Sequence, residues 1–290
     1  MTRAVCLLSL LGIALVCTTA GAEPIQLRFK PKVGQESKHR LMIAARIEES
    51  GGGDEEDRPS TQRSEATVHI DYAQKATAET DEQTTLETRQ LNGQVEVSGE
   101  AGNVTINLPA FSTIQRLDRR RQTVGMEDME GGDPPESDED GTGCDIVGSL
   151  GVGCGEWAGI PGMLTLPAEP VDVGSTWKRD QNAGVSGASF VINYKLEALT
   201  THSGRKCARI HATWRQQFST KGLSDLSEMS AGSVGMFAAE GVNTGDLVWY
   251  YDYENGVDVS IEGALGNEST TVAFHSTGKA AMNLKIVLVE

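Results

Sequence analysis

The heptapeptide Ala66-Thr67-Val68-His69-Ile70-Asp71-Tyr72 decides the fold class, because apolar and polar side chains alternate along it. Successive side chains of an extended backbone point to opposite faces, so one face of this segment is apolar and the other is polar. The same alternation recurs in residues 41–47, 208–215 and 282–288. Strands with one buried and one wet face are typical of antiparallel sheets. The sequence therefore predicts a mainly β protein, a strongly curved antiparallel sheet or open half-barrel with one or two short helices.

Residues with turn chemistry separate the alternating segments. Asn92-Gly93 predicts a tight hairpin turn between residues 84–91 and 94–98, because both residues accept the positive φ that such a turn requires. His202-Ser203-Gly204-Arg205 and Glu254-Asn255-Gly256 predict two further hairpins. These signals indicate a meander of strands that follow one another directly.

The segment most consistent with a helix is residues 110–121. Phe111, Ile114 and Leu117 recur every third residue, which places them near one side of a helix. We therefore expect a short helix here.

A short internal echo bears on the architecture. Pro31-Lys32-Val33-Gly34 is followed by Lys38, and Val171-Asp172-Val173-Gly174 is followed by Lys178. The match is as compatible with chance as with duplication. If it reflects duplication, two similar β halves close into one curved sheet.

Residues 1–22 have the three parts of a secretory signal. Arg3 supplies positive charge, residues 5–16 are almost entirely apolar, and small residues precede a predicted cut before Glu23. Cleavage leaves a single β domain at 23–290, which we expect in the periplasm or outside the cell. No later apolar segment reaches the length of about 20 residues that spans a bilayer.

The charge of the chain excludes some partners, and its cysteines fit an oxidising compartment. With 41 acidic and 25 basic residues, the net charge is −16, so we expect no binding to nucleic acid or to anionic membrane surfaces. Cys144 and Cys154 are candidates for a disulfide that closes a short loop. Cys207 is then the unpaired thiol of the mature chain.

An acidic insert at residues 126–143 interrupts the β pattern. It is poor in apolar residues, so we expect it to be disordered. The alternating carboxylates within and just after it resemble the front of a calcium loop: Glu136, Asp138, Asp140 and Asp145. Glu136 stands where such a loop has Asp, and Val147 stands where it has its closing Glu. A solvated acidic loop is therefore the favoured interpretation, and calcium is the one cofactor considered.

The sequence contains no recognisable catalytic motif. A hydrolase with an unrecognised site centred on His69, His211 or His275 stays open as an alternative, because such sites are defined by geometry. Trp249 and Tyr251 share one face of a predicted strand, and Tyr253 continues that face. These three aromatic residues are candidates for facing a ligand, although core packing explains the same spacing more readily.

Two short elements carry a resemblance. Leu166-Pro167-Ala168-Glu169-Pro170-Val171-Asp172-Val173-Gly174-Ser175-Thr176-Trp177 resembles an element of an uncharacterised family of secreted bacterial β proteins, where it opens the second half of the sheet. Gly245-Asp246-Leu247-Val248-Trp249-Tyr250-Tyr251-Asp252 is similar to a hairpin of the same family. The resemblance assigns no catalytic residue. The predicted meander is also loosely similar, at the level of fold, to the half-barrels that carry lipoproteins and lipids in the bacterial envelope.

Together these features favour a non-catalytic secreted or periplasmic binding protein. Its ligand would be hydrophobic, or a protein, held in the concavity of the sheet. The main alternative is a structural or interaction protein of the envelope that uses its acidic insert.

Overall fold

The computed structural model describes residues 24–51, 60–100, 102–108, 110, 112–128, 164–183, 188–219, 239–271 and 276–289. These residues form twelve strands: β1 (Glu36–Gly51), β2 (Ser60–Glu79), β3 (Gln83–Gly99), β4 (Gly102–Asn107), β5 (Ser112–Asp118), β6 (Thr123–Asp128), β7 (Thr176–Ala183), β8 (Ala188–His202), β9 (Arg205–Ser219), β10 (Ala239–Asp252), β11 (Val257–Thr271) and β12 (Ser276–Val289). None of the described residues lies in a helix, so this part of the chain offers no helical membrane span.

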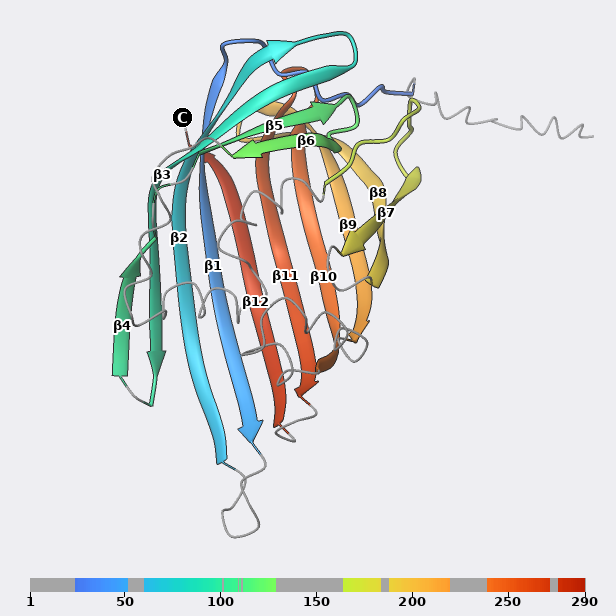
Figure 1. Cartoon of the computed structure of the whole chain (residues 1–290). Helices are drawn as coiled ribbons and strands as arrows, with labels where there is room; N and C mark the ends of the chain where they lie inside the picture. The colour runs from blue at the N-terminus through green and yellow to red at the C-terminus, as the bar shows by residue number, and fades with distance from the viewer. Residues whose placement is uncertain are drawn as a thin grey trace, which may run out of the picture.

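All twelve strands belong to one antiparallel sheet, which is strongly curved (Figure 1). Its order is β6-β5-β3-β2-β1-β12-β11-β10-β9-β8-β7, with β4 paired to β3 beside this path. Most strands pair with their neighbours in sequence, but β5 pairs with β3 rather than with β4, and β6 and β7 lie at opposite edges of the sheet. At the centre, β1 pairs with β12 along residues 38–50 and 277–289. We call β1–β6 the first meander and β7–β12 the second. The first and last of the described strands thus join the two meanders into one layer.

The two faces of this layer differ as the alternation predicts. We call the face that bears Leu41, Ile43 and Ala45 the inner face, and the opposite face, which bears Arg40 and Ala44, the outer face. Leu41, Ile43 and Ala45 are buried, whereas Arg40 and Ala44 are exposed.

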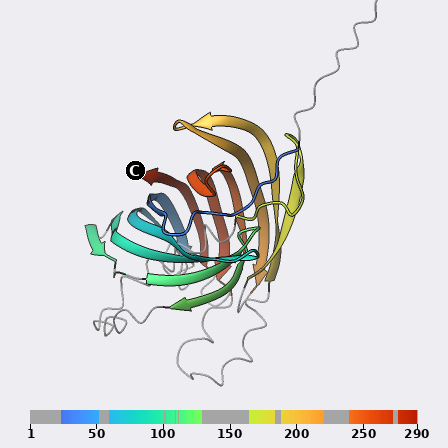
Figure 2. The same ribbon diagram turned by 90° about the horizontal axis from the view of Figure 1, so that it is seen from above.

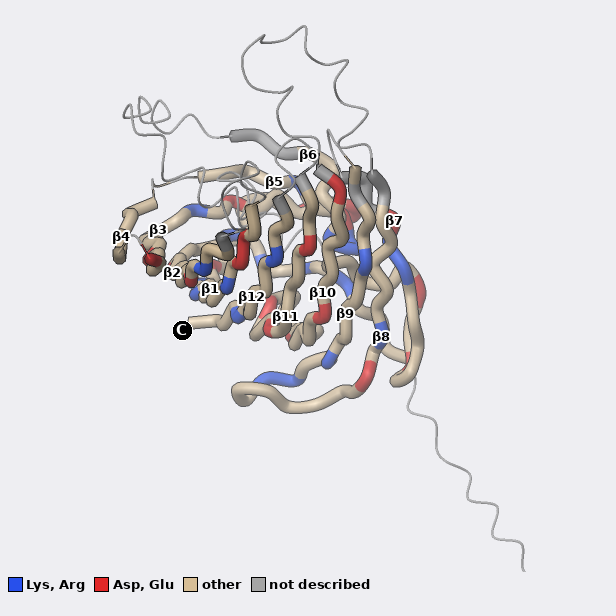
Figure 3. Tube along the Cα trace, turned by 90° about the horizontal axis from the view of Figure 1, so that it is seen from below, with Lys and Arg blue, Asp and Glu red and all other residues tan. Residues whose placement is uncertain are grey.

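Charged side chains of opposite sign pair across neighbouring strands on the outer face. Examples are Arg40–Asp71, Arg46–Glu65, Arg63–Glu48, Lys279–Glu268 and Lys285–Glu262. Both signs are interspersed along the central strands rather than segregated (Figure 3). The outer face is thus a mixed, solvated surface.

One end of the inner face is closed by chain that precedes and follows the first meander. Residues 24–35 cross this end of the curved sheet (Figure 2). The backbone amide of Phe29 donates to the carbonyl of Arg119 (3.0 Å), and that of Leu166 donates to the carbonyl of Arg120 (2.9 Å). Leu27 and Leu164 are buried beneath these contacts. We call this the closed end and the opposite end of the strands the far end.

The internal echo of the sequence has a structural counterpart. Gly34 (φ 82°) donates its amide to Ala76, and Gly174 (φ 97°) donates its amide to Leu196, at 2.8 and 2.7 Å. Both glycines end a turn that leads into the first strand of a meander, β1 or β7. A register shift follows at the partner strand in each case, between Ala76 and Ala78 in β2 and between Leu196 and Ala198 in β8. The two meanders therefore begin with the same local geometry.

Two predictions about local structure differ from the structure. The short helices are not confirmed, because residues 112–118 form β5: Thr113, Gln115 and Leu117 alternate inward, and pairing with β3 overrides the three-residue spacing. The predicted hairpin turn at Asn92-Gly93 is wrong as well, because β3 continues through these two residues. The register slips by one residue at this point, so the dipeptide lies beside a β-bulge. The hairpins at His202–Arg205 and 254–256 are confirmed.

Gly256 allows the β10–β11 turn to pack under the N-terminal segment. Its φ is +70°, and a Cβ atom there would lie 2.7 Å from the carbonyl carbon of Lys30. Gly204, in the β8–β9 turn, has a similar φ of +75° but open space around it. Substituting Gly204 tests backbone strain alone, whereas substituting Gly256 tests backbone strain together with a steric clash.

We expect Gly204→Ala to lower the free energy of unfolding by about 1 kcal/mol, the cost of a left-handed backbone for alanine. Gly256→Ala adds displacement of the N-terminal segment and is expected to cost about 3 kcal/mol. Urea denaturation followed by tryptophan fluorescence measures both. Equal losses would show that Gly256 does not hold this contact.

Candidate functional site

The inner face of the central strands forms one apolar surface. Its side chains come from strands far apart in sequence, because β1 pairs with both β2 and β12. Among them are Ile43, Ala45, Ala66, Val68, Ala212, Leu247, Met282 and Leu284, all buried. Several are alanines, whose small side chains leave a broad surface rather than projecting ridges.

This surface belongs to one layer rather than to a sandwich. The twelve described strands form one continuous sheet in which each strand is hydrogen-bonded to the strands beside it. A second sheet, the usual partner of an apolar sheet face, is thus not among the described elements.

The inner face is also free of charge along most of its length. In the described parts of β1, β2 and β9–β12, the inward positions hold no charged residue between Asp258 at the closed end and Glu49 toward the far end. Near the far end, a ladder of side-chain amides crosses three strands. Asn267 donates to Asn243 (2.6 Å), and Asn243 donates to Gln216 (3.2 Å). Burying an unpaired charge is costly, so such a lining favours uncharged occupants.

A buried ion pair ties the two meanders together at the closed end. The guanidinium of Arg121, which follows β5, pairs with the carboxylate of Asp258 in β11. The indole Nε1–H of Trp249 donates to the same carboxylate at 2.8 Å. The guanidinium carbon of Arg121 lies 5.6 Å from the ring centre of Phe29 and 5.4 Å from that of Trp249. Rings and carboxylate together compensate the buried positive charge.

Arg121 is held at this place by an unusual backbone. Its φ is +65°, in a turn where the carboxylate of Asp118 accepts the amides of Arg120 (2.9 Å) and Gln122 (2.7 Å). Its Nε and Nη1 atoms are buried without a hydrogen-bond partner. A bulky residue with positive φ is rare, so contacts elsewhere must stabilise it.

His39 lies beside this ion pair on the inner face of β1. Its ring stacks on Tyr72 with 5.1 Å between ring centres, and its Nε2 is 3.0 Å from the hydroxyl oxygen of Ser37. Burial lowers the pKa of His39 to about 4; Asp258 opposes this shift and Arg121 adds to it. His39 is therefore neutral at physiological pH, and its Nδ1 atom is buried without a partner.

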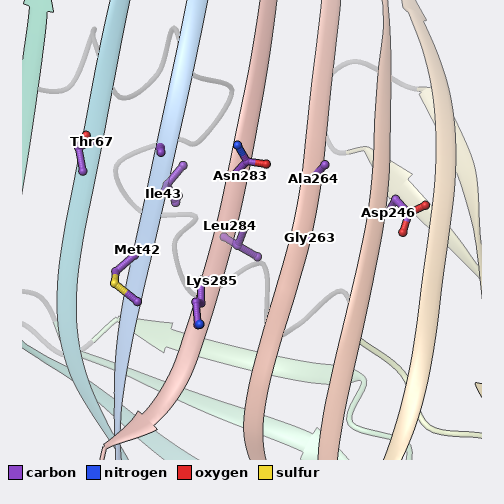
Figure 4. Close-up of a pocket in the computed structure, with 10 residues that line it drawn as sticks. Met42, Ile43, Thr67, Asp246, Gly263, Ala264, Asn283, Leu284 and Lys285 are labelled. Atoms are coloured by element: carbon purple, nitrogen blue, oxygen red, sulfur yellow. The ribbon is translucent and has the colours of Figure 1, made fainter. Parts of the chain in front are cut away.

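The outer face carries a separate open hollow of about 700 Å³ (Figure 4). Small or short outward side chains create it, namely Ala44 of β1, Ala264 of β11 and Asn283 of β12. Met42 and Asp246 lie at its sides in Figure 4. This hollow and the inner face are on opposite sides of the same strands.

The structure places the predicted aromatic residues at the closed end. Trp249 and Tyr251 are fully buried, and the hydroxyl of Tyr251 donates to the carbonyl of Arg28 at 2.7 Å. Tyr253 is half-buried in the β10–β11 turn. The ligand-facing role of these residues stays a prediction.

The two predicted histidines that the structure describes, His69 and His211, lie far apart on the sheet. His69 is exposed on the outer face of β2. His211 lies on the outer face of β9, where its Nε2 is 2.8 Å from Asp246 and its Nδ1 is 3.5 Å from Glu197. Four strands separate β2 from β9 in the sheet.

Other predicted features lie outside the described residues. These are the signal at 1–22, His275, the disulfide candidates Cys144 and Cys154, and the calcium-loop candidates Glu136, Asp138, Asp140 and Asp145. Of the acidic insert 126–143, the described part is 126–128, which ends β6. Cys207 is buried and unpaired, and burial raises the pKa of its thiol to about 11.

Comparison with known proteins identifies no family. No family model matches the chain, and no curated protein matches it, so the resemblance to secreted bacterial β proteins stays a prediction. Two solved structures are distantly similar. One is lipovitellin, in a structure that describes its lipid–protein interactions, with 9% identity and a TM-score of 0.44 over 90% of this chain. This chain spans 25% of that lipovitellin chain.

The other is an outer membrane channel from Pseudomonas putida F1, with 8% identity and a TM-score of 0.32. The match covers 92% of this chain and 100% of the channel. With such low identities and TM-scores, neither likeness indicates a function for this chain.

Removing the carboxylate of Asp258 is expected to destabilise the fold strongly. Asp258→Asn leaves the Arg121 charge buried without a counter-charge, which costs about 3–5 kcal/mol. Glu254→Gln is the matched control, because its pair with Lys206 is exposed and screened by solvent, so a much smaller loss of stability is expected. Chemical denaturation at neutral pH compares the two, and similar losses would contradict the role of the buried pair.

His39 is expected to make stability depend on pH. Its pKa is lower in the folded chain than the ordinary 6.5, so the stability it contributes is full above pH 6.5 and is lost as pH falls toward 4. The expected loss over that range is about 3 kcal/mol. In His39→Phe, which keeps a ring against Tyr72, the loss between pH 7 and pH 4 should be smaller by that amount. Parallel stability–pH curves for the two proteins would refute the assignment.

Proposed function

We propose that this protein is a non-catalytic binding protein of the periplasm or the extracellular space that holds an apolar ligand against its inner face. The proposal rests on one observation: a broad, uncharged apolar surface formed by a single curved sheet layer. A surface of this kind provides much binding free energy without requiring a specific counter-charge.

The energetics favour a ligand with long apolar segments. Each methylene moved from water to an apolar surface contributes about 0.8 kcal/mol. Inward alanines such as Ala45, Ala66 and Ala212, which are buried in this structure, are small enough for a flexible chain that occupies this face to lie close to the strands. A lipid acyl chain or a comparable apolar chain of a modified protein has the required chemistry.

Neighbouring alanines on opposite faces of β1 test which face binds. Ala45 points inward and is buried, whereas Ala44 points outward into the outer hollow. Diphenylhexatriene, an uncharged apolar fluorophore, serves as the probe. We expect the natural protein to bind it, Ala45→Phe to weaken binding at least fivefold, and Ala44→Phe to change it by less than twofold.

The smaller pair Ala45→Val and Ala44→Val covers the case in which phenylalanine unfolds the chain, and thermal melting checks that each variant is folded. Organic extracts of the purified protein are analysed for lipid by mass spectrometry. No fluorophore binding together with no co-purified lipid would overturn the proposal. Loss of binding in the Ala44 variants instead would move the site to the outer hollow and overturn the inner-face assignment.

A further inference from the structure

The inner face of the first meander carries a line of uncharged polar side chains that the apolar surface does not explain. Ser37 of β1, Gln74 of β2, Thr88 of β3 and Thr113 of β5 are paired across successive strands, Ser37 with Gln74, Gln74 with Thr88, and Thr88 with Thr113. His39 lies two residues further along β1. We call these five residues the polar track. At the level of His39, the inward positions of β9 and β10 hold Ala208 and Tyr251.

The track is deeply buried, although its members are polar. Gln74, Thr88 and Thr113 are 8%, 3% and 7% exposed. Polar side chains at such positions are normally hydrogen-bonded, because an unpaired buried group costs about 1–3 kcal/mol. The hydrogen bonds of the track therefore show which of its polar atoms are left without a partner.

The middle of the track is bonded internally, but its two ends are not. Gln74 Nε2 donates to Thr88 Oγ1 at 3.3 Å, and Ser37 Oγ donates to the carbonyl of Gln74 at 3.5 Å. At one end, Nδ1 of His39 has no partner; at the other, the hydroxyl of Thr113 has none. The inner face therefore carries two buried groups of the track, His39 Nδ1 and the Thr113 hydroxyl, that have no hydrogen-bond partner.

A small cavity lies at the His39 end of the track. Its volume of about 20 Å³ is enough for one group of the size of a water molecule or a hydroxyl. Ser37, His39, Gln74 and Asp258 are among its lining residues. A group placed here has several polar side chains within its surroundings.

The charges around the track select against a charged group. Arg121 and Asp258 lie at this end of the inner face and neutralise each other. A phosphate or carboxylate near the track would meet a pair of no net charge, because the unpartnered Nε and Nη1 of Arg121 would attract it while the adjacent carboxylate of Asp258 would repel it. Burying it without a partner costs far more than burying a hydroxyl.

We propose that the polar track binds hydroxyl groups in the uncharged head of an amphiphile whose apolar chain lies along the inner face. This inference rests on the proposed function and adds the class of ligand, a lipid with an uncharged hydroxylated head. The head lies toward the closed end, and the chain extends toward the far end.

Three probes with the same acyl chain separate head from chain: 1-monooleoylglycerol, methyl oleate and oleate. At neutral pH we expect the natural protein to bind monooleoylglycerol at least tenfold more tightly than either of the others. Thr113→Val removes the unpartnered hydroxyl with little change of shape, so it should weaken monooleoylglycerol binding about fivefold and leave methyl oleate unchanged. Competition with bound diphenylhexatriene measures all three affinities.

Thr67→Val is the matched control, because Thr67 lies on the outer face of β2 and lines the outer hollow. It should leave all affinities unchanged. Gln74→Met is a second variant within the track and should act in the same direction as Thr113→Val. Thermal melting verifies folding.

Equal affinities for monooleoylglycerol and methyl oleate, unchanged in both track variants, would overturn the inference and leave the track as a site for water alone. Tighter binding of oleate would overturn the selection for an uncharged head. In both cases the proposed function would stand. Absence of binding by all three probes and by diphenylhexatriene would instead overturn the proposed function itself.

Discussion

Pairing between the first and last strands of the chain is the constraint on which the rest of the structure depends. β1 and β12 are paired along thirteen residue pairs, from Lys38–Val289 to Ser50–Thr277. Without this seam, each meander would expose a free edge at the centre of the molecule, and an open strand edge is a site for unwanted pairing. With it, the inward side chains of 41–47 and 282–286 lie side by side and become one surface.

At the closed end, segments outside the strands bury the apolar inner face, which a second sheet would bury in a sandwich. Leu27 and Phe29 from the N-terminal segment and Leu164 and Leu166 from the chain before β7 cover the apolar ends of the strands. The Arg121–Asp258 pair joins the turn after β5 to β11 across this end. Because the pair is buried, its value for stability lies less in attraction than in the high cost of separating it.

The two meanders share a starting geometry but differ in the chemistry of their inner faces. The turns that end at Gly34 and Gly174 make the same backbone bonds. Near the closed end the first meander presents Gln74, Thr88 and Thr113 inward, whereas the second presents Ala208 and Tyr251. The inward amides of the second meander, Gln216, Asn243 and Asn267, lie near the far end. The curved sheet therefore carries inward hydrogen-bonding groups at different ends of its two meanders, with apolar side chains between them.

The sequence by itself determined the mainly β fold class, the two faces of residues 41–47, 66–72, 208–215 and 282–288, and the hairpins at 202–205 and 254–256, because alternation and turn chemistry are local properties of the chain. It failed at residues 112–118, where a helix-like spacing was overridden by pairing with β3, and at Asn92-Gly93, where the long partner β2 carries β3 straight through a turn signal. The sequence also held one signal of the polar track, since Gln74 falls at the inward position between Tyr72 and Ala76.

Only the tertiary structure decided which residues form the candidate site. Arg121 and Asp258 are 137 residues apart, and no pattern along the chain relates them. The pairing of β1 with β12, the line from Ser37 to Thr113 and the burial of His39 depend equally on contacts between distant strands. Side-chain direction is set by the neighbouring residues, but proximity across a sheet is set by register, and register arises only when the whole sheet has assembled.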